Sequence, residues 1–308
     1  MKTKKKAEQT VLTLLASVWA LICLFPVWIL FSGAFSLDSN NLTKTFFPNS
    51  LTNGILKCKE ALVTIDIATA TIHTFIYTAI TVVGILVISS LAAYEFTFYQ
   101  FPLKKFFFGS MMVSMMLPQV LYIIPLYRLV FGLGLSDTFA GISFPMMVSA
   151  LSVFIMMQFL EDLPLSFIES ARIDGAGHFQ IYGRIVLPLM RNGILTTVVL
   201  MFMKTWGQYL WPSLVTGQKI KPISVTISNM LSPNFWVDPR VKIAAMLIAM
   251  LPPLLIYLIF QRYVIDYHVR CKRLMCCSKI KRFLGGKEYE GICCFQRRFT
   301  QVVLHSGG

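Results

Sequence analysis

The sequence predicts an all-α, polytopic membrane protein. Three observations lead to this fold class: 56% of the 308 residues are hydrophobic, only 14% are charged, and the mean hydropathy is +0.67. A soluble domain usually carries about 25% charged residues. The apolar runs are therefore interpreted first as membrane spans, each of which needs about 20 residues to cross the hydrocarbon core as a helix.

Six apolar runs are long enough to be such spans. They cover residues 10–35, 71–95, 106–131, 139–160, 194–215 and 241–263. The first run follows the basic stretch "KTKKK", is longer than the apolar part of a signal peptide and lacks a small-residue cleavage site. We therefore expect six transmembrane helices, the first of them uncleaved, with both termini on the same side.

The basic residues predict which side that is. With six spans, the N-terminus, the second and fourth connections and the C-terminal tail fall on one side, and most of the Lys and Arg residues behind the net charge of +14 lie there. The positive-inside rule makes this side cytoplasmic, although Lys44, Lys57, Lys59, Lys219 and Lys221 lie in the outer loops. The charge therefore indicates membrane topology and not nucleic-acid binding. The predicted organisation is a cytoplasmic N-terminus (1–9), a membrane domain (10–265) and a basic, cysteine-rich cytoplasmic tail (266–308).

The tail holds five of the seven cysteines, at positions Cys271, Cys276, Cys277, Cys293 and Cys294. A cytoplasmic location argues against a disulfide framework, and adjacent cysteine pairs do not have the usual spacing of zinc ligands. Contact of this basic segment with anionic lipid is the better expectation. No cluster of His, Asp or Glu at catalytic spacing occurs in the spans, so we expect no catalytic residue, no metal site and no cofactor in this chain.

A polar insert, "ESARIDGAGHFQIYGRIVLPLM", interrupts the apolar pattern between the fourth and fifth spans. Before its glycines, Pro164 can occupy the first turn of a short helix in which Phe167, Ile168 and Ala171 share a face. Gly175 and Gly177 can end that helix.

A second short helix is predicted after the glycines. Phe179, Tyr182 and Ile185 would line one of its faces, and Pro188 would break it where the fifth span begins. Two amphipathic helices joined by a glycine elbow can dock into the groove of a partner protein, or they can lie on the lipid surface. The residues by themselves leave both alternatives open.

The insert resembles the EAA loop of ABC-importer permeases. The matching positions are Glu169-Ser170-Ala171, Asp174-Gly175-Ala176 and Ile185-Val186-Leu187-Pro188, with Ser170 in place of an alanine. The resemblance implies a coupling helix pair that docks into a cleft of a separate ATP-binding subunit. Glu169 would make a polar contact there, Ala171 would allow close approach, and Gly175 would form the elbow. The chain has no Walker-type phosphate loop, which agrees with ATP hydrolysis by another subunit.

Four further stretches, "SSLAAYEF", "MLPQVLYIIPLYRLVFGLGLSDT", "TWGQYLWPSLV" and "AAMLIAMLPPLLIYLIFQRYVI", resemble carbohydrate-uptake permeases, most closely the smaller (MalG-like) permease of maltose-like systems. The resemblance implies a sugar importer in the bacterial cytoplasmic membrane. Its partners would be a second, different permease subunit, two ATP-binding subunits and an extracytoplasmic sugar-binding protein. Import of a polyamine or peptide is the alternative. A self-sufficient carrier would instead predict intramembrane ionisable pairs or internal repeats.

The stretch "KTWGQYLWP" in the fifth span supplies candidate substrate-pathway residues: Lys204, Trp206, Gln208, Tyr209 and Trp211. A mid-membrane lysine costs about 2.5–3.5 kcal/mol to insert, so it normally faces a cavity or a partner. Since the resembling permeases usually carry a small or apolar residue at this position, Lys204 suggests an acidic sugar; the alternative is a lysine that snorkels or pairs with the partner permease. Aromatic rings can stack on sugars and Gln208 can bond hydroxyl groups, whereas Trp211 could instead belong to an interfacial aromatic belt.

Overall fold

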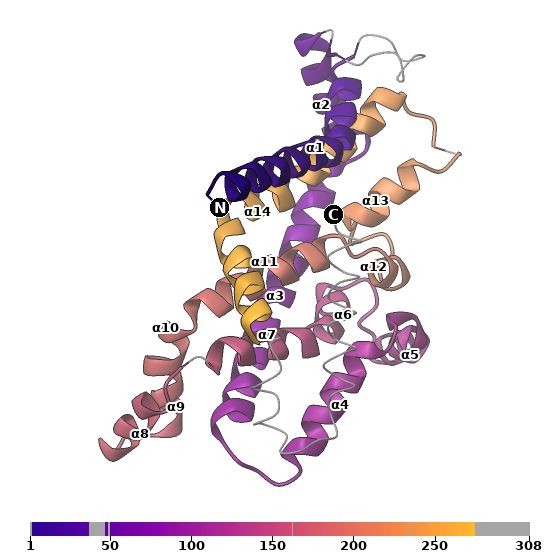
Figure 1. Ribbon diagram of the computed structural model, residues 1–308. Helices are drawn as coiled ribbons and strands as arrows, with labels where there is room; N and C mark the ends of the chain where they lie inside the picture. The colour runs from indigo at the N-terminus through magenta and orange to yellow at the C-terminus, as the bar shows by residue number, and fades with distance from the viewer. Residues whose placement is uncertain (1, 37–46, 49, 162, 234, 275–308) are drawn as a thin grey trace. The chain divides into compact units, whose positions relative to one another are not determined.

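The computed structural model describes residues 2–36, 47–48, 50–161, 163–233 and 235–274, and all regular elements within these ranges are helical. The described residues fall into two compact units. Unit 1 holds the described residues up to Ile67 together with Asn229–Met250, and unit 2 holds Ala68–Ser228 together with the described residues from Leu251 to Leu274 (Figure 1).

Unit 1 contains α1 (Lys2–Ala34), α2 (Leu51–Thr64) and the first part of α14 (Pro239–Leu274). The Ser50 hydroxyl caps α2 by accepting a hydrogen bond from the Asn53 backbone N–H at 3.2 Å. The Asn53 side chain donates to the Ser36 carbonyl at 3.0 Å, which ties the residues after α1 to α2. At Gly54 a Cβ would lie 2.0 Å from a Phe35 ring carbon, so this close approach requires glycine.

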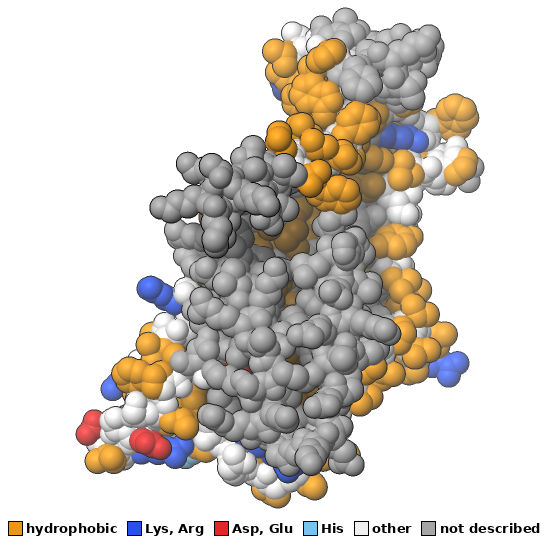
Figure 2. All heavy atoms as spheres, viewed as in Figure 1, with side chains coloured by type: hydrophobic (Ala, Val, Ile, Leu, Met, Phe, Trp, Pro, Cys, Tyr) orange, Lys and Arg blue, Asp and Glu red, His pale blue; other side chains and the backbone are white. Residues whose placement is uncertain are grey.

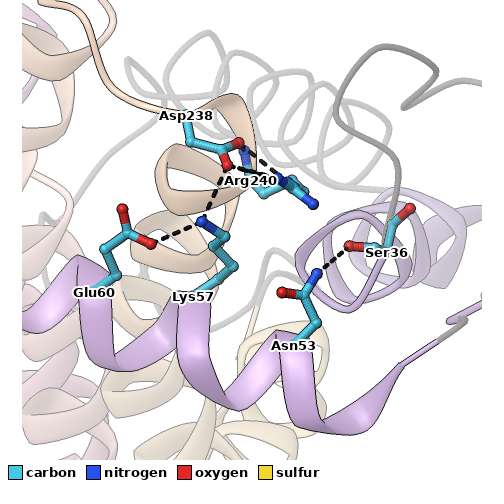
Figure 3. Close-up of polar contacts among 6 residues, drawn as sticks. All are labelled: Ser36, Asn53, Lys57, Glu60, Asp238 and Arg240. Carbon is cyan, nitrogen blue, oxygen red and sulfur yellow. Dashed lines mark hydrogen bonds and ion pairs between the residues drawn. The ribbon is translucent and has the colours of Figure 1, made fainter.

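Charged side chains join α2 to the start of α14 (Figure 3). The Lys57 Nζ lies 2.8 Å from Glu60 Oε2 and 3.1 Å from Asp238 Oδ2. The Arg240 guanidinium lies 2.8 Å from the same Asp238 oxygen. Burial alone would raise the pKa of Asp238, but hydrogen bonds from Arg240 and Lys57 outweigh it and lower that pKa to about 2.

Asp238→Asn should destabilise unit 1, because it leaves Lys57 and Arg240 close together without their shared carboxylate. Loss of these charge-assisted hydrogen bonds should cost about 1–3 kcal/mol, seen as a lower melting temperature of the purified protein at pH 7. The unfolded pKa of Asp is about 3.9 and the folded value is lower, so the stabilisation is present above that unfolded value and is lost as the pH falls toward 2. The difference from wild type should therefore stay constant from about pH 5 to 8.

The matched control for this prediction is Asp174→Asn, which makes the same change at an exposed position outside unit 1. Equal melting temperatures for the two variants would show that the Asp238 ion pairs contribute nothing.

Unit 2 contains most of the helices. In chain order they are α3 (Ile67–Phe98, from its second residue), α4 (Lys104–Met116), η1 (Gln119–Leu121), α5 (Ile123–Gly132), α6 (Phe139–Ser143), η2 (Phe144–Met146), α7 (Ala150–Leu160), α8 (Ser166–Ile173), α9 (His178–Ile181), the π-helical η3 (Tyr182–Val186), α10 (Leu187–Leu189), α11 (Arg191–Trp206), α12 (Leu210–Val215), most of α13 (Ile223–Met230) and the end of α14.

The predicted spans are partly continuous and partly broken. In the described part of the chain, three helices are long and apolar enough to cross a membrane: Thr13–Ala34, Ile67–Phe98 and Pro239–Gln261. Two helix pairs that are bent by 50° and 73° raise this number to as many as five. Pro118 and Pro145 fall at breaks in the third and fourth predicted spans, because proline lacks the N–H that a continuing helix needs. Six crossings remain a prediction.

Two apolar clusters form the core of unit 2. The first, called the knob cluster, joins α3, α7, α8 and the segment after α9; its buried residues are Ala93, Tyr94, Val153, Met156, Met157, Leu160, Ile168, Ala171, Ile181, Val186 and Met190. The second, called the tryptophan cluster, consists of Tyr77, Ile123, Val130, Ile142, Trp211, Val215 and Ile220. Figure 1 shows α8 and α9 together, and α5, α6 and α12 as a separate group of the same unit.

The predicted tail begins inside a helix, since α14 continues to Leu274. Cys276, Cys277, Cys293 and Cys294 lie outside the described residues. In the described part, no group of three or more His, Cys, Asp and Glu side chains is arranged to hold a metal ion.

Candidate functional site

The polar insert folds as two short helices around a glycine elbow. Gly175 has φ +79°, the left-handed conformation that glycine adopts without strain. Its N–H donates to the Arg172 carbonyl at 3.0 Å, and the Ala176 N–H donates to the Ala171 carbonyl at 2.9 Å. This pair of bonds is a Schellman motif, which satisfies the last carbonyls of α8. The elbow predicted at Gly175 is therefore present, and α8, the elbow and α9 are called the knob below.

Gly177 does not share the role of Gly175. Its φ of −72° is ordinary for any residue, and it precedes the first residue of α9. Pro164 also differs from expectation, because α8 begins two residues later, at Ser166. The helical segment that contains Pro188 continues to Leu189, and the 73° bend follows at Met190.

The structure divides the predicted apolar faces of the knob between buried and exposed residues. Ile168 and Ala171 of α8 are buried in the knob cluster, and Ile181 of α9 is 1% exposed. By contrast, Phe167 is 53% exposed and Phe179 is 84% exposed. The predicted apolar faces are therefore only partly buried in the chain's own core, and Phe167 and Phe179 stay accessible.

The buried position of Ala171 also changes its expected role. The close approach that its small side chain allows is to the core of this chain. Ile185 and Leu187 pack partly against the same cluster, together with Ala176, while Pro188 is exposed.

The exposed face of the knob is mixed in chemistry. Glu169, Ser170 and Asp174 are all exposed, and Figure 2 shows acidic and basic side chains gathered over the region of α8 and α9. Ile173 is 87% exposed beside them. Sequence reasoning missed the exposed Ile173; the signal was an isoleucine between Arg172 and Asp174, outside the apolar face of α8. An exposed isoleucine among charges suits a protein interface.

The second candidate site is a contact between two helix breaks. The third predicted span breaks around η1, and the fifth breaks at Gly207 between α11 and α12. The Gln208 Nε2 donates to Gln119 Oε1 at 2.9 Å, which joins the two breaks. The Ser224 hydroxyl donates to the Gln208 carbonyl at 2.7 Å. Sequence reasoning selected Gln208 and missed Gln119, although Gln119 follows Pro118 in the middle of an apolar run.

Lys204 and Tyr209 lie on either side of the break at Gly207. Lys204 is exposed in the last turn of α11 and makes no ion pair with the described residues. Tyr209 is 46% exposed, and its hydroxyl accepts a hydrogen bond from Ser228 at 3.3 Å. Both side chains are therefore accessible next to the Gln119–Gln208 contact.

The two tryptophans are core residues. Trp206 is 5% exposed and stacks on Phe202 with ring centroids 5.4 Å apart. Trp211 is fully buried in the tryptophan cluster, and its indole N–H donates to the Ile142 carbonyl at 3.1 Å. Neither ring is free to stack on a sugar in this conformation, and Trp211 is not part of an interfacial belt.

The loop after α12 is fastened at several points, which the sequence did not reveal. The Lys219 and Ile220 N–H groups donate to the Asp137 carboxylate at 2.9 and 3.0 Å. Burial would raise the pKa of Asp137, but these backbone donors lower it. At the start of α3, His73 Nδ1 accepts from the Lys221 N–H at 3.2 Å and Thr74 Oγ1 accepts from the Ile223 N–H at 2.8 Å. His73 is half-buried and is engaged by the backbone of this loop.

Comparison with known proteins identifies the family. Residues 84–266 match the family model described as the inner membrane component of binding-protein-dependent transport systems. The chain belongs to this family.

Curated relatives agree over most of the chain. The sn-glycerol-3-phosphate transport system permease protein UgpE of Agrobacterium fabrum is 32% identical over 80% of this chain and 90% of its own length. The protein of the same name from Rhizobium meliloti is 30% identical over 86% of this chain and 97% of its own length.

A solved structure shows the same fold. It is described as a bacterial ABC transporter involved in the import of the acidic polysaccharide alginate, with a TM-score of 0.74 at 23% identity over 84% of this chain and 97% of that one. The prediction of an ABC-importer permease, a membrane transport subunit and not an enzyme, is confirmed.

Proposed function

We propose that this permease forms half of the translocation pathway of an ATP-driven importer for an anionic sugar or sugar-like polyol. The knob is the observation that carries the coupling role: a glycine elbow presents Glu169, Asp174 and Ile173 outward while the opposite face packs into the chain's own core. A helix pair held in this way suits docking into a groove better than lying on lipid, because its outward side mixes carboxylates with apolar residues, whereas a helix on lipid presents a separate apolar face.

The proposed assembly follows from this role and from the family. It contains a second permease subunit, two ATP-binding subunits and an extracytoplasmic binding protein, and this chain holds no cofactor. The chain crosses the inner membrane six times with both termini in the cytoplasm. In this topology α4–η1–α5, α6–η2–α7 and α11–α12 are the broken crossings.

The Gln119–Gln208 contact marks the proposed substrate path. Irregular backbone at membrane depth is tolerated only where it is buried in protein or lines a water-filled cavity. Two such breaks meet here, with Lys204 and Tyr209 exposed beside them. Lys204, Gln208 and Tyr209 are therefore the substrate-facing candidates that we retain, and Trp206 and Trp211 support them from the core.

The substrate class rests on charge. The relatives are named for transport of sn-glycerol 3-phosphate, and the solved structure for an acidic polysaccharide; both compounds are anionic. An exposed lysine with no ion-pair partner among the described residues can supply the matching positive charge. A neutral sugar would not need it.

Co-purification tests the coupling role. Expressed with the ATP-binding subunit of its own system, the wild-type chain should co-purify with that subunit in detergent. Glu169→Lys should weaken the association at least about tenfold, because reversing a charge at an interface costs about 1.4 kcal/mol or more of binding free energy. Glu95→Lys, the same change at an exposed position on α3, is the control. Retention of the subunit by Glu169→Lys at the wild-type level would refute docking through this face.

Lys204→Met tests the substrate class. In reconstituted vesicles it should reduce uptake of sn-glycerol 3-phosphate or another anionic substrate about tenfold, since a hydrogen bond to a charged group is worth roughly 1.5–3 kcal/mol. Lys219→Met removes the same charge from the exposed loop and should have little effect. Equal losses for neutral and anionic sugars would contradict an anion-binding role for Lys204.

A further inference from the structure

A tyrosine directly after α3 contacts both helices of the knob. The Tyr99 ring stacks on His178, the first residue of α9, with centroids 4.8 Å apart. The Arg172 guanidinium, in the last turn of α8, lies 4.9 Å from the centroid of the same ring. A guanidinium over the face of an aromatic ring makes a favourable cation–π contact. One side chain therefore joins the residues on both sides of Gly175 to α3.

Tyr99 is itself held firmly in place. Its carbonyl accepts a hydrogen bond from the Lys104 ammonium at 2.8 Å, and Lys104 is only 7% exposed. Its hydroxyl shares a hydrogen bond of 2.7 Å with the hydroxyl of Tyr94, which is buried on α3. The ring is thus fixed to the end of α3 through both its backbone and its hydroxyl group.

A second link runs beside the first. The Tyr182 hydroxyl, after α9, shares a hydrogen bond of 2.6 Å with Ser90 of α3. The rings of Tyr182 and Tyr94 lie 5.5 Å apart. The knob is therefore joined to α3 by contacts that are independent of its covalent connections to α7 and α11.

The opposite end of α3 holds the loop after α12, through His73 and Thr74. From Thr74 to Phe98, α3 is one unbroken helix of roughly 36 Å at 1.5 Å rise per residue. Sharp bends in helices occur at breaks, and α3 has none here, so it can carry a displacement of its Tyr99 end to the loop at residues 221–223.

We propose that α3 transmits movement of the knob to the loop after α12, and that Tyr99 is the positioning residue that joins the knob to this rod. The proposal rests on the proposed docking of the knob to an ATP-binding subunit. It assigns α3 a transmission route that does not pass through α11, the helix to which the knob is covalently continuous. The knob and the loop after α12 would then be coupled through one element, α3.

The test uses the assembled transporter in vesicles, with a fluorophore at the exposed Gln218 introduced through an unnatural amino acid. A non-hydrolysable ATP analogue should change the Gln218 signal in the wild type. Tyr99→Ala should still co-purify with the ATP-binding subunit but should lose at least half of that signal change. Tyr99→Phe keeps the ring on Arg172 and His178 and should restore it.

Two further measurements keep the proposal falsifiable. If Tyr99→Ala does not fold, the double variant Arg172→Gln with His178→Ala removes the same ring contacts from two exposed positions and leaves α3 intact. A full Gln218 response in either variant, with the ATP-binding subunit bound, would overturn the transmission role. Failure of the wild type to co-purify would instead overturn the docking role, and the transmission role with it.

Discussion

Gly175→Val is expected to reduce transport more than tenfold while the membrane helices remain folded. Gly175 adopts φ +79°, and a left-handed conformation costs an ordinary L-residue about 1–2 kcal/mol and a β-branched one more. The chain should relieve this strain by opening the Schellman bonds that end α8. The exposed faces of α8 and α9 would then no longer be presented together. Transport and co-purification with the ATP-binding subunit are the measurements.

Gly177→Val is the matched control for this prediction. Both glycines are exposed, and at neither would a Cβ approach another atom within 4 Å. They differ in backbone conformation, because Gly177 has φ −72° and ψ 163°, which suits valine. Transport by Gly177→Val should stay within about twofold of wild type, since valine fits this backbone conformation and the N–H at this position can still donate to Gln180 Oε1. Equal defects in the two variants would show that the elbow conformation is not what matters.

Gly141→Ala is expected to have the largest effect on stability. A Cβ at this position would lie 2.1 Å from the Leu135 carbonyl oxygen and 3.2 Å from a Val130 methyl carbon. The first of these atoms is backbone and cannot rotate away, so α6 must shift. Ile142 is the next residue, and its carbonyl holds the Trp211 indole. The shift should therefore loosen the tryptophan cluster by about 3 kcal/mol, the upper part of the usual range for overpacking.

The measurement is thermal unfolding of the purified protein in detergent. Gly141→Ala should melt several degrees lower than wild type or fail to accumulate in the membrane. Gly132→Ala is the control: this glycine ends α5, and a Cβ there would meet nothing within 4 Å. Alanine is a better helix former than glycine, so Gly132→Ala should be neutral or slightly stabilising. A melting temperature for Gly141→Ala equal to that of Gly132→Ala would refute the clash.

Sequence reasoning worked best where the relevant interaction is local. The glycine elbow at Gly175 and the helices on both sides of it were predicted, because helix ends and left-handed turns are determined by a few consecutive residues. The long apolar runs correctly predicted the continuous helices α1, α3 and α14, because helix formation also depends on residues that are close in sequence. The face that Phe167, Ile168 and Ala171 were predicted to share is divided in the structure, because Ile168 and Ala171 are buried but Phe167 is exposed.

The sequence by itself determined the membrane class, the long helices, the elbow and the family resemblance. Only the tertiary structure decided that Trp211 is buried against Ile142, that Gln208 meets Gln119, and that Tyr99 joins α3 to the knob. These partners are separated by many residues, and each contact depends on where a helix breaks or bends. Composition and periodicity indicate which residues tend to be buried. The direction in which a side chain points after a helix break is instead set by the packing of the neighbouring helices.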